Sequence, residues 1–310
     1  MNKNFEHLWI SLLDSPAFRR FSRAGLGKYL FGSKAFNYLR LFKNAITSSV
    51  EIRRYPGLFD GVRTFCLFVG HNKSGTSMVG SLLDAHPDAI VSDEERALEY
   101  VDAGFRREQL FHILLKGSRR EFLKGRVTAR RLTPYSYLVP GQWQGRYHRL
   151  RVIGDGAAGS STQFFARDPE LLSRLEKLMN GIDVKFIQVI RNPFDPISVM
   201  MVRGKRTFEN SIEHYFTSCE TLVQMRRQLD DSQLRAVHYE DFVTSPEKHL
   251  SELCNFLGLE PHSDYLQACA SLMRPSPDQQ RNMVQWDAHW IGVVQEKIDR
   301  YDFLQGYRFE

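Results

Sequence analysis

Short apolar runs alternate with helical patterns from about residue 63 onward. Five short runs predict strands: 65–69, 89–91, 151–154, 186–190 and 236–239. The first is continuously apolar, which suggests a strand buried on both faces. Residues at helical spacing occupy 78–83, 170–178 and 246–257. This alternation predicts an α/β fold of three layers, in which a parallel sheet is flanked by helices on both faces. Ligands of such sheets bind beyond the carboxyl ends of the strands.

The first 60 residues follow a different pattern. Apolar residues at helical spacing open the chain: Phe5, Leu8, Trp9, Leu12 and Leu13. Residues 29–46 then mix aromatic side chains with lysine and arginine. We expect a helical N-terminal extension over 1–60 and a main domain over 61–310. The extension is either an arm that packs on the main domain or a basic amphipathic surface that contacts a membrane or a partner.

Charge and cysteine content narrow the class of protein. The formal net charge is +6, but Lys and Arg are scattered in twos without a run of five, which does not favour nucleic-acid binding. The four cysteines form no CxxC pair and have no zinc-finger spacing, which fits reduced thiols. No apolar stretch reaches the roughly 18 residues of a membrane span, and the first 15 residues lack the apolar core of a secretory signal. We therefore expect a cytoplasmic protein.

A phosphate-binding loop is predicted directly after the first strand. The segment Gly70–Met78 reads GHNKSGTSM between a strand and a helix, where backbone N–H groups and the helix dipole favour an anion. Gly70, Gly75 and Ser77 match the nucleotide-triphosphate loop GxxxxGK[ST], but position 76 is Thr and the lysine is Lys73. No apolar strand ends in a convincing magnesium-binding Asp. Both departures count against an ATP- or GTP-hydrolysing enzyme.

A second anion site is predicted after the fourth strand. Arg191 stands at the end of that strand, two residues before Pro193, which suits the start of a helix. A guanidinium there points into the ligand crevice and pairs with a phosphate through parallel hydrogen bonds.

Together these segments resemble the PAPS-dependent sulfotransferases, which use 3′-phosphoadenosine 5′-phosphosulfate (PAPS) as sulfuryl donor and have a P-loop NTPase-like fold. The resemblance covers residues 63–310 and implies that Lys73 contacts the phosphosulfate. It implies that Ser74, Gly75, Thr76 and Ser77 hold the 5′-phosphate. Arg191 would grip the 3′-phosphate, together with a hydroxyl eight positions later; Val199 stands there, and Ser198 is the nearest substitute.

Two further stretches extend the resemblance. His238–Phe242 reads HYEDF, a family block that we interpret as scaffold, with Glu240 and Asp241 structural rather than catalytic. Near the C-terminus, Arg281 is the candidate for the family's basic loop that closes over the nucleotide.

The general base is the least determined residue. The stretch from His86 to Glu95 resembles the HPD…E segment of carbohydrate-type sulfotransferases, and alignment on His86-Pro87 puts Glu95 in the role of base. Glu94 is the alternative, followed by a histidine such as His71 or His112. These acids could instead simply begin a helix. Many relatives have a lysine after the aspartate at 155, where this chain has Gly156.

The sequence thus predicts in-line transfer of a sulfuryl group from PAPS to a hydroxyl or amine acceptor, with no metal required. Lys73 would neutralise charge on the leaving phosphate. The acceptor is not identified, although a carbohydrate fits the basic, aromatic residues 100–150, which could equally be a solvated helix pair. The alternatives are a P-loop kinase or hydrolase and a non-catalytic nucleotide-binding protein of the same fold.

Overall fold

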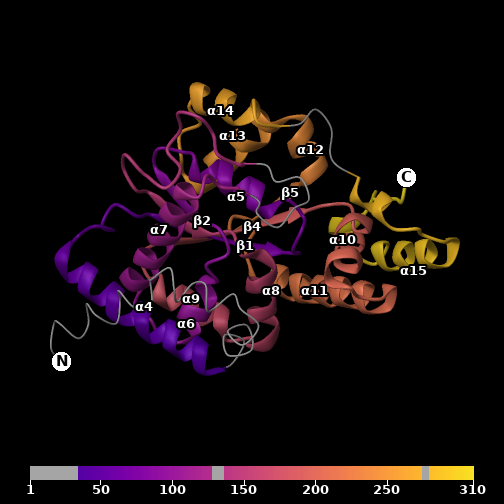
Figure 1. The fold of residues 1–310 in the computed structure, drawn as a ribbon, viewed down its shortest axis with the longest axis horizontal. Coiled ribbons are helices and arrows are strands. Elements are labelled where there is room, and N and C mark those ends of the chain that lie inside the picture. Colours follow the sequence, from indigo (N-terminus) through magenta and orange to yellow (C-terminus); the bar gives the residue numbers. More distant parts are fainter. Residues whose placement is uncertain (1–33, 128–135, 274–278) are drawn as a thin grey trace.

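The strand β1 (Thr64–Gly70) is the centre of a five-stranded parallel sheet in the computed structural model (Figure 1). The structure describes residues 34–127, 136–273 and 279–310. The strand order is β2-β3-β1-β4-β5, and all four pairings are parallel. The other strands are β2 (Ala89–Ser92), β3 (Val152–Asp155), β4 (Asp183–Ile190) and β5 (Leu234–His238). All five predicted strands are confirmed, with ends shifted by up to three residues.

Alternate side chains of β1 enter two separate cores. Phe65, Leu67 and Val69 face one side of the sheet, while Cys66 and Phe68 face the other. All seven residues of the strand are buried, which explains why the apolar run is continuous. The predicted three-layer α/β fold is therefore confirmed.

Helices cover both faces of the sheet. The first core is closed by α6 (Ala97–Asp102), α7 (Arg107–Leu123), α8 (Ala158–Arg167) and α9 (Leu171–Leu178). The second is closed by α5 (Thr76–Asp84), α12 (Tyr239–Thr244), α13 (Pro246–Leu257) and α14 (Ser263–Ala270). A third cluster joins α10 (Phe194–Gly204), α11 (Phe208–Gln228), α15 (Ala288–Ile298) and the 3₁₀ turn Asp302–Leu304.

The helix α4 (Lys34–Arg54) lies outside the first core, against α7 (Figure 1). The apolar pattern predicted over residues 5–13 lies outside the described residues, and the division of the chain at residue 60 stays a prediction. Within the described part of the chain, no helix is both long and apolar enough to cross a membrane.

Candidate active site

The loop between β1 and α5 turns through three residues with positive φ. Gly70, Lys73 and Gly75 have φ values of 120°, 72° and 97°. A left-handed conformation costs a non-glycine residue about 1–2 kcal/mol, so Lys73 is held there by its surroundings. Gly75 is required for a second reason: a Cβ at this position would lie 2.4 Å from the Tyr239 ring.

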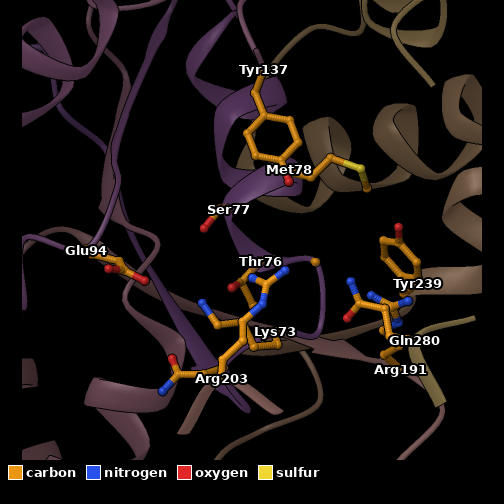
Figure 2. A pocket seen from close by; sticks show the side chains of 12 residues that line it. Lys73, Thr76, Ser77, Met78, Glu94, Tyr137, Arg191, Arg203, Tyr239 and Gln280 are labelled. Atoms are coloured by element: carbon orange, nitrogen blue, oxygen red, sulfur yellow. The ribbon is translucent and has the colours of Figure 1, made fainter. Parts of the chain in front are cut away.

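A cleft opens at this loop, and both predicted anchors line it. Figure 2 shows Glu94 on one side and Arg191, Gln280 and Tyr239 on the other, with Lys73, Thr76 and Arg203 between them in this view. The complete lining comprises Asn72, Lys73, Gly75, Thr76, Ser77, Met78, Glu94, Tyr137, Arg191, Arg203, Tyr239 and Gln280. Lys73 and Arg191, 118 positions apart in sequence, thus face one cavity because β1 and β4 are neighbours.

Arg191 is held by a buried carboxylate that sequence reasoning did not single out. Its Nε donates to Asp195 Oδ2 at 3.1 Å, and Asp195 Oδ1 accepts from the Arg281 backbone N–H at 2.7 Å. Arg281 Nη1 lies 3.6 Å from the same oxygen. Asp195 therefore fixes Arg191 and ties the 3₁₀ turn Gln280–Met283 to the first turn of α10.

Tyr239 lies against Arg191 and beside Gly75 of the loop. The Arg191 guanidinium lies 4.5 Å from the centre of its ring, a cation–π contact. The next residue, Glu240, accepts from the Asn192 backbone N–H at 3.0 Å and from the Tyr307 hydroxyl at 2.8 Å. The HYEDF block therefore places an aromatic ring in the cleft and braces the turn after β4.

Three predicted contacts lie away from the cleft lining. Ser198 is fully buried, and its hydroxyl accepts from Trp286 Nε1 at 3.0 Å. Ser74 is also buried, with no hydrogen-bond partner for its Oγ among the described residues. The Arg281 side chain is 7% exposed and does not line the cleft, whereas its neighbour Gln280 does.

The structure separates the two candidate glutamates. Glu94 has φ 56° and lines the cleft, and it is the only acid among the described lining residues. Glu95 turns the opposite way, pairs with Arg120 and packs on Gly117, where a Cβ would lie 2.5 Å from its Cγ. The Glu95 carboxylate thus pairs with Arg120 and does not line the cleft, and the choice of base between the two glutamates stays a prediction.

Two more acidic residues, Asp155 and Asp93, lie near the turn after β2. Asp155 is fully buried and accepts from the backbone N–H groups of Glu95 and Ala97 at 3.0 and 2.7 Å, which fixes the turn after β2. Burial raises its pKa to about 7. Asp93 was not predicted: burial, and next the charge of Glu94, raise its pKa to about 6, while a hydrogen bond with Ser77 lowers it. Its Oδ1 is buried without a partner among the described residues.

The two histidine alternatives do not line the cleft. His71 is buried with its ring stacked 3.7 Å from Tyr215, and its Nε2 lies 2.9 Å from the Tyr215 carbonyl oxygen. Burial lowers its pKa to about 4. His112 lies on α7 and does not line the cleft, and burial lowers its pKa also.

Comparison with known proteins identifies the family of this chain. A protein-family model described as the sulfotransferase family matches residues 67–264, nearly two thirds of the chain and both anchors. The chain belongs to the sulfotransferase family. No curated protein matches it.

Solved structures with a similar fold include three sulfotransferases of low identity. The sulfotransferase domain of the Synechococcus PCC 7002 olefin synthase has 17% identity, covers 78% of this chain and 95% of that chain, and gives a TM-score of 0.46. The sulfotransferase domain from the curacin biosynthetic pathway has 16% identity, covers 77% and 98%, and gives 0.49. The sulfotransferase STF1 of Mycobacterium tuberculosis has 14% identity, covers 96% and 98%, and gives 0.47.

In this sulfotransferase the cleft contains a further cation, Arg203, that the sequence did not reveal. Arg203 is exposed at the end of α10 and has no acid within ion-pair distance in the described part of the chain. From the basic, aromatic stretch 100–150, Tyr137 is the described residue that reaches the cleft. Arg130, Arg131 and Tyr135 of that stretch lie outside the described residues.

Proposed function

We propose that the chain transfers a sulfuryl group from PAPS to a hydroxyl or amine of an acceptor. The observation that carries the proposal is the shared cleft: Lys73 at the end of β1 and Arg191 at the end of β4 line one cavity. A ligand that meets both must carry anionic groups at two separated positions. PAPS does so, with a 3′-phosphate and a 5′-phosphosulfate.

The Arg191 side is suited to the 3′-phosphate. Arg191 is 4% exposed and held by Asp195, so little side-chain entropy is lost when it pairs with a dianion. The loop side is suited to the 5′ end, where the N-terminus of α5, Thr76 and Ser77 offer donors. Ser198 has no part in this proposal, because its hydroxyl bonds Trp286.

The reaction would be an in-line displacement at sulfur. An acceptor oxygen or nitrogen forms a bond to sulfur, while the bond from sulfur to the 5′-phosphate oxygen breaks. The products are the sulfated acceptor and 3′-phosphoadenosine 5′-phosphate (PAP). Lys73, exposed and without an ion pair in the described chain, would neutralise the charge that develops on the leaving phosphate.

The acceptor's proton needs a base on the side opposite the nucleotide grip. Glu94 lies there, across the cleft from Arg191, with Lys73 between them in Figure 2. We therefore assign the role of general base, which accepts the proton of the acceptor's hydroxyl or amine, to Glu94 rather than Glu95.

Two measurements test this function. Purified protein with PAPS carrying radiolabelled sulfate and a library of sugars, phenols, alcohols and amines should yield a labelled acceptor, and the absence of transfer to every class would count against an active enzyme. In thermal melting, PAP should raise the midpoint far more than ATP with magnesium. Equal shifts of the melting midpoint with PAP and with ATP would exclude the assignment of the 3′-phosphate to Arg191. They would favour a P-loop kinase or hydrolase instead.

A further inference from the structure

The helix α4 has one side that packs on the main domain and another side that is exposed and apolar. Its inner side is anchored: the Gln109 side chain donates to Ser49 Oγ at 2.9 Å, and Arg40 pairs with Glu99 at 2.5 Å. Leu41 and Ala45 pack on the first core. The helix is therefore held against α6 and α7 rather than loosely attached.

The outward side carries large apolar residues in solvent. Tyr38, Leu39 and Phe42 are 69%, 53% and 62% exposed, and Val50, two turns further along, is 45% exposed. At about 100° per residue these four positions fall within an arc of about 120° on the helix, and Leu41 and Ala45 lie in the arc beside it. Three of the nine large apolar residues exposed on the described chain thus gather within five positions, where soluble proteins usually scatter them singly.

Positive charge accompanies this apolar side. Arg53 and Arg54 are exposed in the last turn of α4. Across the whole sequence, residues 1–60 hold 10 of the 42 lysines and arginines but only 4 of the 36 acids. Residues 61–310 therefore have 32 of each, so the entire net charge of +6 resides in the first 60 residues.

We propose that the outer side of α4, defined by Tyr38, Leu39, Phe42 and Val50 with Arg53 and Arg54, docks on a membrane surface rich in anionic phospholipid. Apolar and aromatic side chains on a basic helix match the acyl boundary and the headgroups of such a surface. Each basic residue near an anionic bilayer adds favourable energy, so Arg53 and Arg54, in a segment that carries the net positive charge of the sequence, favour anionic lipid over a neutral partner. The contact is peripheral and leaves the cleft at the carboxyl ends of β1 and β4 unaltered.

The test is co-sedimentation of the full chain with vesicles. Phosphatidylcholine vesicles containing about 30% phosphatidylserine should bind at least about tenfold more tightly than pure phosphatidylcholine at roughly 0.1 M salt. The double variant Tyr38→Glu/Phe42→Glu should weaken that binding at least about tenfold. Arg53→Glu/Arg54→Glu should reduce the preference for phosphatidylserine without touching the apolar residues, because it lowers the net charge of residues 1–60 from +6 to +2.

Leu123→Glu is the matched control, because Leu123 is an 82% exposed apolar residue on a different helix. It should bind vesicles like the unaltered chain, and all variants should keep their melting midpoint and its shift with PAP. Equal sedimentation with both lipids, or equal loss in Leu123→Glu, would overturn the proposal. So would a dimer in solution that the double variant dissociates, since the surface would then join two copies of this chain.

Discussion

The two ends of the cleft are built in opposite ways. At β4, Arg191 is 4% exposed, its Nε is bonded to Asp195, and its guanidinium lies over Tyr239. At β1 and β2, Lys73 and Glu94 are exposed and held in left-handed backbone, with no described ion pair. The first arrangement is assembled before any ligand arrives, as suits a binding site. The second leaves charges uncompensated until substrate arrives, as suits the site of bond breaking.

Lys73→Ala is expected to give the largest effect, since it removes the cation of the phosphate-binding loop, which has no ion pair among the described residues. Turnover should fall by about a hundred- to a thousandfold, the magnitude typical of losing a charge-stabilising donor. Steady-state kinetics measures this, with Lys177→Ala, an exposed lysine on α9, as control. Turnover within a few-fold of the unaltered chain would show that the leaving phosphate is stabilised elsewhere.

Glu94→Gln should lower turnover about a hundredfold or more while PAP binding persists, because a positioned base contributes that much. Glu95→Gln is the matched comparison and should stay within a few-fold, because the Glu95 carboxylate pairs with Arg120 outside the cleft. If Glu95→Gln is the variant that loses turnover, the alignment on His86-Pro87 is right and the geometric argument is wrong.

Asp93→Asn is expected to give the smallest effect, on stability. The folded-state pKa of Asp93 is raised from 3.8 to about 6, first by burial and then by Glu94, so the folded protein binds this proton more tightly than the unfolded chain. Stability from this group is complete below about pH 4 and is lost as the pH rises through about 6. Asn removes the penalty and should stabilise the protein by about 1–3 kcal/mol at pH 8 and little at pH 4.

Denaturant unfolding at the two pH values measures that difference. Asp231→Asn, at an exposed aspartate, serves as control. Equal effects of Asp93→Asn at both pH values would show that the carboxyl titrates near its ordinary pKa.

The same contrast explains what could be predicted from the sequence. The phosphate-binding loop could be predicted because its strand, glycines and lysine are adjacent in sequence. Arg191 could be predicted because it lies between a strand and Pro193. The choice between Glu94 and Glu95 could not be predicted from the sequence. It depends on the positive φ of Glu94 and on a hydrogen bond from the Glu95 N–H to Asp155, 60 positions away. The Ser198 hydroxyl accepts a hydrogen bond from Trp286, 88 positions later, and no local sequence pattern predicts this contact.

The central claim is that the two strand ends hold opposite phosphates of one nucleotide, and calorimetric titration with PAP and 5′-AMP tests it most directly. The unaltered chain should bind PAP far more tightly, and Arg191→Ala should cost about 2–5 kcal/mol for PAP while leaving 5′-AMP nearly unchanged. Lys73→Ala should keep the preference for PAP. Equal affinity of the unaltered chain for the two nucleotides, or a preference that survives Arg191→Ala, would contradict the account.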